Sequence, residues 1–183
     1  RDLSTGLITE VNEQGNTLCT EDLEIFFRKL KKYLPNSEIT ILAGSLPPET
    51  SDCFYTAAIQ MSAQMNSRVI FDADGSALKL GIQSKPYAIK PNLAEPEQLT
   101  GKVLDSYDKI RIEAQRLAKT GIQILLVSMG EKGAVFHCKG TTWRVLPLQV
   151  DVKSTIGAGD AMVAALSWCI LKDCSPEDTA RIT

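Results

Sequence analysis

Short runs of apolar residues alternate along this chain with longer segments in which apolar residues recur every three or four positions. The runs at 39–43, 68–72, 87–90 and 122–127 are each followed by a loop rich in Gly, Pro, Asn, Asp or Ser. Such runs are typical of strands that are buried on both faces, and the periodic segments predict amphipathic helices. Strands that alternate with helices indicate an α/β fold, in which helices cover both faces of a mostly parallel sheet.

The periodic segments predict where the helices lie in the sequence. Thr20 can cap the first helix, whose first turn is acidic. Its predicted apolar face consists of Ile25, Phe26, Leu30 and Leu34. Further helices are expected at about 51–66, around 78–80, after 92, at about 107–119, from the glycine turn at 157–159 to 171, and from about 174 onward. A strand at 7–12 with a turn behind it, and a hairpin formed by 133–138 and 142–145, complete the predicted elements.

Composition narrows the class of protein. With 183 residues, 44% of them hydrophobic, the chain has the size of one globular domain, so residues 1–183 are predicted to form a single domain. The net charge is −2 and the 20 Lys and Arg residues are spread out, which argues against a nucleic-acid partner. No apolar run approaches the roughly 20 residues of a membrane span, so no membrane partner is expected. The five cysteines lack metal-ligand spacing and are expected to be reduced thiols of a cytoplasmic protein.

Candidate chemistry is expected at one edge of the predicted sheet. In open sheets of this kind, ligands bind in the crevice outside the carboxyl ends of the strands. This rule selects the loops that follow Ala43, Asp72, Lys90 and Ser128. The segment 153–163 is a further candidate, because an extended polar stretch there turns into a helix of small apolar residues.

Two glycines, Gly157 and Gly159, flank Ala158 at the start of that helix. With no bulky side chain in the way, successive amides can point into one concavity, where the helix dipole adds positive potential. Asp160 lies in the first turn, where the dipole favours its ionised form. Phosphoryl transfer requires such donors for the charge on the phosphate and an acceptor for the proton of the attacking hydroxyl. An ordinary glycine turn with a capping aspartate is the competing interpretation.

The loop after the run at 87–90 contains Asn92 and Glu95, which are three residues apart. On a helix the two side chains would lie on one face and could share a hydrated cation. They also fit a capping box, with Asn92 as N-cap and Glu95 at the third helical position. The two interpretations are compatible with each other.

Two other loops offer groups for a ligand. Gly44 and Ser45 follow the first buried strand, with two prolines stiffening the loop behind the hydroxyl, and from local physics alone a structural turn is the favoured interpretation. A second loop is bracketed by glycines and could approach a nucleotide closely, or could simply connect two strands of a hairpin. It consists of Ser128, Met129, Gly130, Glu131, Lys132 and Gly133.

Four stretches of the chain resemble motifs of the PfkB carbohydrate kinases, which form a ribokinase-like superfamily. They are I-L-A-G-S-L-P-P, K-P-N-L-A-E, V-S-M-G-E-K-G-A and S-T-I-G-A-G-D, in the family's order and at about its spacing. The resemblance implies a ribokinase-like three-layer αβα sandwich with a mostly parallel central sheet. The family's N-terminal third, with its Gly-Gly signature and most sugar contacts, has no counterpart here, nor has its C-terminal end. The chain is therefore expected to be an internal fragment with an incomplete sheet.

The same resemblance implies an ATP- and Mg²⁺-dependent kinase of a sugar or sugar phosphate. Asp160 would be the base on the sugar hydroxyl, and Gly157, Ala158 and Gly159 would form the anion hole. Asn92 and Glu95 match the family's N-x-x-E motif, which acts on Mg²⁺ and phosphate largely through water.

By the same resemblance, the loop 128–133 and Gly159 would contact ATP. Gly44, Ser45 and Asp160 would contact the sugar phosphate, and a homodimer of the full-length protein is compatible with the family.

Residues before the glycine turn separate branches of the family. Ser154 and Thr155 resemble 1-phosphofructokinases, whereas tagatose-6-phosphate kinases tend to have Asn-Pro there. This implies phosphorylation of fructose 1-phosphate to fructose 1,6-bisphosphate. A tagatose-6-phosphate kinase or 6-phosphofructokinase of the same family, and a non-catalytic nucleotide-binding regulator on the same fold, are the alternatives. Pro96 and Ala165 depart from the leucine and glycine that are frequent in the family, away from the expected chemistry.

Overall fold

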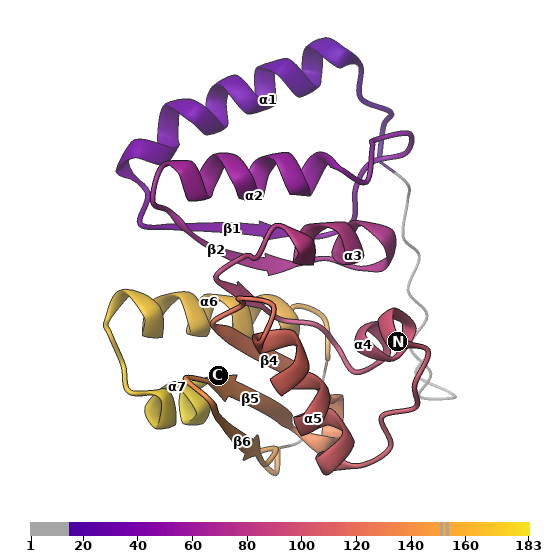
Figure 1. Cartoon of the computed structure of the whole chain (residues 1–183), viewed down its shortest axis with the longest axis vertical. Coiled ribbons are helices and arrows are strands. Elements are labelled where there is room, and N and C mark those ends of the chain that lie inside the picture. The colour runs from indigo at the N-terminus through magenta and orange to yellow at the C-terminus, as the bar shows by residue number, and fades with distance from the viewer. Residues whose placement is uncertain (1–14, 151, 153) are drawn as a thin grey trace.

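Six strands form one sheet, in which each strand pairs with the next along the chain (Figure 1). The structure is a computed structural model that describes residues 15–150, 152 and 154–183. The first four strands are parallel and the last two are antiparallel to their neighbours. The strands are β1 (Ile39–Ala43), β2 (Arg68–Asp72), β3 (Ala88–Ile89), β4 (Ile124–Ser128), β5 (Ala134–Cys138) and β6 (Thr141–Val145).

The helices lie close to their predicted positions. They are α1 (Thr20–Tyr33), α2 (Phe54–Gln64), α3 (Gly75–Gln83), α4 (Ala94–Thr100), α5 (Tyr107–Ala118), α6 (Ala158–Leu171) and α7 (Pro176–Ile182), with short 3₁₀ helices η1 (Leu34–Asn36) and η2 (Gly130–Lys132). The predicted strand at 7–12 lies outside the described residues. Strands β1 and β2 match the predicted runs at both ends, and the hairpin of β5 and β6 is confirmed.

Each face of the sheet has its own apolar core, because successive side chains of a strand point to opposite faces. Phe71 of β2 packs with residues of α2, α3 and the end of α5, whereas the neighbouring Ile70 packs with α6 and α7. Leu125 and Leu126 of β4 divide in the same way. The sheet therefore lies between two helical layers, which confirms the predicted three-layer α/β architecture.

Helix α1 departs from its prediction in two details. Its N-cap is Cys19 and not Thr20, because the Cys19 amide donates a hydrogen bond to the Asp22 carboxylate (3.0 Å) in a capping box. Of the predicted apolar face, Ile25 and Phe26 remain 37% and 38% exposed.

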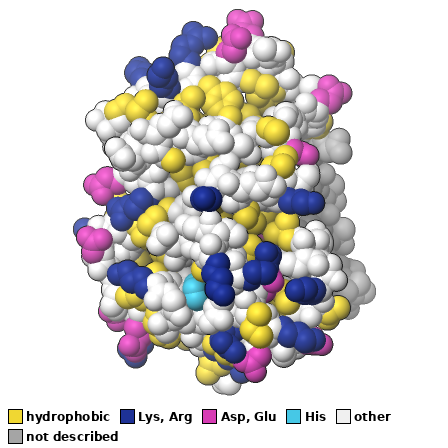
Figure 2. Space-filling model, in the orientation of Figure 1, with side chains coloured by type: hydrophobic (Ala, Val, Ile, Leu, Met, Phe, Trp, Pro, Cys, Tyr) yellow, Lys and Arg dark blue, Asp and Glu magenta, His cyan; other side chains and the backbone are white. Residues whose placement is uncertain are grey.

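The predicted Leu30 packs against the core and Leu34 is buried. Phe27, which was not predicted, also packs there, because α1 lies outside α2 and contacts Phe54. The Phe26 ring also contacts Phe54, 4.9 Å away between centroids. Figure 2 shows hydrophobic side chains gathered at the surface over this part of the molecule.

Within the described ranges, no helix has the length and apolar character needed to cross a membrane.

Gly81 in α3 is expected to be intolerant of a side chain. A Cβ at this position would overlap the ring of Phe71, which is fully buried, and would lie 3.3 Å from Ile59 Cδ1. Replacing an unconstrained helical Gly by Ala stabilises a helix by about 0.5–1 kcal/mol, but overpacking a core costs about 1–3 kcal/mol. Gly81→Ala is therefore expected to lower the free energy of unfolding by about 1–2 kcal/mol, measured by urea denaturation of the full-length protein.

The matched control is Gly15→Ala, since a Cβ at Gly15 meets nothing within 4 Å. If Gly81→Ala unfolds at the same or a higher urea concentration than the wild type, α3 and β2 are less tightly packed than this argument requires.

Candidate active site

The candidate site lies at the carboxyl ends of the parallel strands, as the strand-exit rule predicts. In Figure 1, β1 and β2 point to the right, and α4 lies beyond that end of the sheet. Helix α6 also begins there, because Gly159 in its first turn approaches Lys90, directly after β3. The chain thereby brings two helix N-termini to the edge where β1 to β4 end.

The glycine turn, defined here as Gly157 to Asp160, starts α6. Gly157 is the N-cap and has a left-handed backbone (φ +79°), which favours glycine. The Ala158 amide donates to the Thr155 carbonyl at 3.2 Å, so it is engaged within the turn. Among the described residues, the amides of Gly159 and Asp160 have no hydrogen-bond acceptor, as is usual in the first turn of a helix. Two amides and the exposed Asp160 carboxylate thus surround the positive end of the α6 dipole.

A buried ion pair lies beside this turn. The Lys90 ammonium is 3.0 Å from Asp72 Oδ2, and the two side chains are 7% and 19% exposed. Burial raises the pKa of Asp72 above its ordinary value, the Lys90 charge opposes that rise, and Asp160 and Asp74 reinforce it. The site therefore combines one buried cation with several carboxylates at the ends of neighbouring strands.

Asn92 and Glu95 form the reciprocal contacts of a capping box at the start of α4. The Asn92 side-chain oxygen accepts hydrogen bonds from the amides of Ala94 (2.9 Å) and Glu95 (3.2 Å). The Glu95 carboxylate accepts from the Asn92 amide at 3.0 Å and from the Asn92 side-chain NH₂. The contacts of the predicted capping box are therefore present, but the N-cap residue differs from the prediction: α4 begins at Ala94 with Leu93 as its N-cap, so Glu95 is its second residue.

The electrostatic environment of Glu95 suits a cation. Burial raises the pKa of Glu95 to about 7; the Asn92 amide opposes the rise, while Asp72 and Asp74 add to it. A positive charge at this place would favour the ionised carboxylate. Within the described part of the chain, no group of three or more His, Cys, Asp or Glu side chains is arranged to enclose a metal ion. Glu95 and its surroundings would fit Mg²⁺ held through one carboxylate and its own water molecules, which is how proteins commonly bind this ion.

Gly44 and Ser45 form the exit of β1. Gly44 has φ +99°, and its amide donates to the Asp72 carbonyl at 2.9 Å. The buried Tyr55 hydroxyl donates to the Gly44 carbonyl at 2.8 Å. These contacts fix the backbone of the loop and leave Ser45 exposed.

The loop 128–133 is a tight connection between β4 and β5. The Met129 amide donates to the Gly133 carbonyl at 2.8 Å, and η2 fills the turn. Gly133 has φ +87°, and a Cβ there would overlap the carbonyl oxygen of Val145. The hairpin connection is therefore observed, while a contact between this loop and a nucleotide remains a prediction.

Comparison with known proteins shows the family of the chain. The sequence model of the pfkB family carbohydrate kinases matches residues 4–182. The chain belongs to this family. Among curated relatives of this pfkB-family chain, the 1-phosphofructokinase of Vibrio cholerae is 31% identical over 177 residues, covering 97% of this chain and 56% of the relative. The 1-phosphofructokinase of Haemophilus influenzae is 32% identical over 173 residues, covering 94% and 55%.

A solved structure shows the same architecture. The phosphofructokinase-2 of Escherichia coli, in complex with fructose-6-phosphate, superposes with a TM-score of 0.84 at 27% identity. The match covers 97% of this chain and 58% of that structure. This pfkB-family chain thus spans just over half the length of the relatives it matches, and it shares their ribokinase-like fold.

The structure joins some of the predicted site residues and leaves others apart. Asn92 and Ser128 form an isolated parallel bridge, which ties two of the predicted loops together. In the described ranges, no hydrogen bond or ion pair joins Ser45 to the glycine turn. Asp72 and Lys90 were absent from the predicted site, although both end apolar runs at the selected edge. A charged residue that closes a buried strand run is the signal that would have found them.

Proposed function

We propose that the full-length protein transfers the γ-phosphoryl group of ATP to a hydroxyl of a sugar phosphate, with fructose 1-phosphate as acceptor and fructose 1,6-bisphosphate as product. The observation that supports this most is the start of α6, where the amides of Gly159 and Asp160 lack an acceptor among the described residues and the Asp160 carboxylate is exposed beside them. Donors for a phosphate and an acceptor for a proton are thereby present within one helical turn.

The reaction assigns a task to each group. Asp160 accepts the proton of the acceptor hydroxyl as its oxygen bonds to the γ-phosphorus and the bond from that phosphorus to the ADP oxygen breaks. The amides of Gly159 and Asp160 stabilise charge on the transferred phosphoryl group. Glu95 would orient water in the shell of a bound Mg²⁺, and that ion would neutralise part of the phosphate charge. The loop 128–133 is proposed to line the nucleotide, and Gly44 and Ser45 the floor of the sugar site.

The choice of sugar phosphate rests on the relatives. Two curated relatives that cover nearly all of this chain are 1-phosphofructokinases, and Ser154 and Thr155 resemble that branch. The likeness to a phosphofructokinase-2 solved with fructose-6-phosphate supports a 6-phosphofructokinase as the second candidate. A coupled ADP-release assay of the full-length protein with fructose 1-phosphate, fructose 6-phosphate and tagatose 6-phosphate decides between them. ADP release with none of these sugars would reject the kinase proposal and favour a nucleotide-binding regulator.

Glu95→Gln is expected to raise the Mg²⁺ concentration needed for half-maximal rate in the full-length protein, because it removes the charge that orients metal-bound water. Since the pKa of Glu95 is raised to about 7, this concentration in the wild type is expected to rise as the pH falls from about 8 to about 6. In this range protonation neutralises Glu95, and the neutral form no longer attracts the cation. The variant has no such group, so its Mg²⁺ requirement should stay high and nearly independent of pH.

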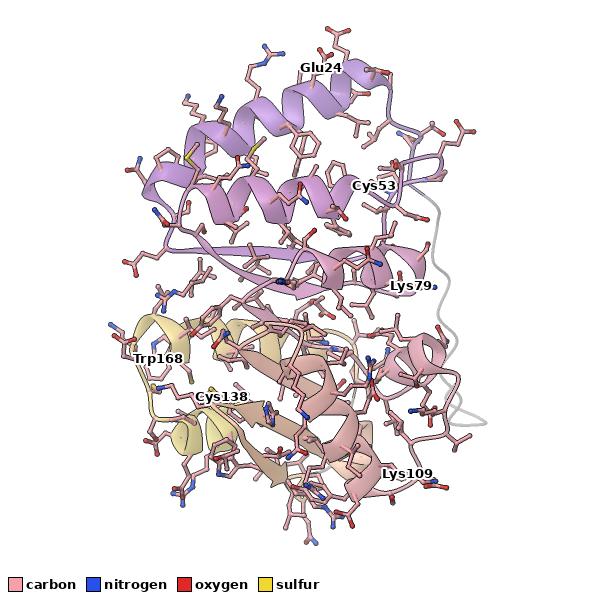
Figure 3. All side chains as sticks on the ribbon, viewed as in Figure 1. Glu24, Cys53, Lys79, Lys109, Cys138 and Trp168 are labelled. Carbon is pink, nitrogen blue, oxygen red and sulfur yellow. The ribbon has the colours of Figure 1, made fainter. Side chains whose placement is uncertain are left out.

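The matched control is Glu24→Gln, since Glu24 lies exposed on α1, away from the site (Figure 3). If the magnesium titration of Glu95→Gln matches that of the wild type at each pH, Glu95 has no role toward Mg²⁺ and only its contacts with Asn92 remain.

A further inference from the structure

Two cysteines occupy the two facing positions of the turn that ends α6. Asp173 has a left-handed backbone (φ +49°), and its amide donates to the Ile170 carbonyl at 3.4 Å. The next amide, that of Cys174, donates to the Cys169 carbonyl at 3.0 Å. These two bonds form a Schellman motif, in which the side chains at the two ends of the longer bond commonly contact each other. Cys169 and Cys174 hold these two positions, and the chain turns back directly into α7 (Figure 1).

The turn keeps the two cysteines within the range of a disulfide. The 3.0 Å hydrogen bond joins the Cys174 nitrogen to the Cys169 oxygen, so ordinary bond lengths place the two Cα atoms less than about 7 Å apart. Disulfides usually join Cα atoms that are about 4.4–6.8 Å apart. On the other side of Cys174, the Ser175 hydroxyl caps α7 by accepting from the Asp178 amide at 3.1 Å. Because the backbone is fixed on both sides, a bond between the two sulfur atoms needs side-chain rotation more than backbone movement.

The two thiols differ in exposure. Cys169 is 1% exposed, whereas Cys174 is half-buried. Burial raises the pKa of the Cys169 thiol above its ordinary value, the neighbouring Cys174 thiol adds to the rise, and the Thr179 hydroxyl opposes it. Both cysteines line one cavity of about 120 Å³, which is several times the space that a water molecule needs. A small polar oxidant can therefore reach Cys174 first, with Cys169 next to it.

An apolar contact explains only part of this arrangement. Cysteine packs like a small hydrophobic side chain, and the Schellman motif favours an apolar pair at these two positions. This interpretation accounts for the burial of Cys169, but an aliphatic pair would satisfy it equally. Two thiols at this spacing allow a reaction that an aliphatic pair does not.

We propose that Cys169 and Cys174 are a redox-active pair, which hydrogen peroxide oxidises to an intrachain disulfide across the junction of α6 and α7. The Cys174 sulfur takes one oxygen of the peroxide as the O–O bond breaks, which gives a sulfenic acid and one water molecule. The Cys169 sulfur then bonds to the Cys174 sulfur, the S–O bond breaks, and the hydroxyl leaves with the Cys169 proton as a second water. The two thiols thereby lose two electrons and two protons to one peroxide molecule. The pair is independent of the proposed kinase function.

Peptide mapping of the full-length protein tests this proposal. The protein is treated with hydrogen peroxide, its remaining free thiols are blocked with iodoacetamide, and it is digested with trypsin. Because Lys172 lies between the two cysteines, trypsin separates them into peptides 154–172 and 173–181. Mass spectrometry is expected to find these two peptides joined, two hydrogens lighter than their sum, with loss of most of the free Cys174 thiol. Dithiothreitol added before the digestion is expected to abolish the joined species.

Cys138 of β5 provides the matched control, because it is buried and lines the same cavity. Cys138→Ala is expected to form the bond to the same extent as the wild type. Cys169→Ala lacks the second thiol of the pair, so its Cys174 is expected to proceed to sulfinic acid, which dithiothreitol does not reduce.

The proposal is overturned if the two wild-type peptides stay unlinked after peroxide treatment. It is also overturned if either of them is joined mainly to peptide 133–139, which contains Cys138. Equal recovery of the free Cys174 thiol by dithiothreitol in Cys169→Ala and wild type contradicts the role of Cys169 in the pair. Because the wild-type map requires no substitution, a variant that fails to fold does not affect the first two outcomes.

Discussion

Asp160→Asn is expected to lower kcat of the full-length protein by about 10²- to 10⁴-fold, the usual contribution of a general base, while ATP affinity changes little. The substitution keeps the shape of the side chain and a hydrogen-bond acceptor, but removes the charge and the site for the proton. Asp160 is exposed in the first turn of α6, where its carboxylate accepts no hydrogen bond from another described side chain. Its loss should therefore leave the fold intact. In a loose phosphoryl-transfer transition state the hydroxyl keeps its proton until late, so part of the loss reflects poorer positioning of the hydroxyl.

The control for this substitution is Asp173→Asn, just beyond the far end of the same helix. Asp173 is exposed and has a left-handed backbone (φ +49°), a conformation that Asn tolerates well. The control is expected to have wild-type kcat. If Asp160→Asn retains kcat within about threefold of wild type, the assignment of Asp160 as the base is wrong.

Gly159→Val is expected to reduce turnover by several orders of magnitude. Its backbone is not left-handed, since the positive φ in this turn belongs to Gly157, so the effect comes from the side chain alone. A Cβ at position 159 would lie 3.3 Å from Lys90 Nζ. The two methyl groups of valine would reach farther, and their rotation is restricted. They would displace the ammonium and cover the amides of Gly159 and Asp160, which are proposed to donate to the phosphoryl group.

Steady-state kinetics of Gly159→Val, Gly159→Ala and Ala161→Val distinguishes coverage of the amides from general disruption of α6. Ala161 is exposed two residues farther along α6, so valine there is expected to cost little. Gly159→Ala should be intermediate, because a single methyl group meets only the flexible end of Lys90. If Gly159→Val has near-normal turnover, the glycine turn does not bind the phosphoryl group and has a structural role only.

Much of the fold follows from local pattern. The runs 39–43 and 68–72 predict β1 and β2 at both ends, because strands buried in a parallel sheet need apolar residues throughout and are closed by loop residues. The strand-exit rule also selected the loops of the candidate site, since it depends on topology and not on individual side chains. The pairing of Asn92 with Glu95 was predictable from spacing alone, because capping is local.

What the pattern missed depends on contacts between distant segments. Which of Phe26 and Phe27 is covered depends on how α1 lies against α2, and helical periodicity alone allows both. Lys90 ends an apolar run, and nothing nearby in the sequence shows that it is buried. Its partner Asp72 lies in the preceding strand of the sheet, and the register of β2 with β3 brings the two together.

Helix α6 sets a limit on how this protein can change in length. Its first turn carries Gly159 and Asp160, while Val163, Leu166 and Ile170 along the same helix are buried against the sheet. Each residue of an α-helix advances the chain by about 1.5 Å and turns it by about 100°. A single insertion or deletion between Asp160 and Val163 would therefore swing the carboxylate about 100° away from its place over the sheet while the core residues stayed fixed. Related sequences are expected to gain or lose residues within the exposed segment 146–150 and never within α6.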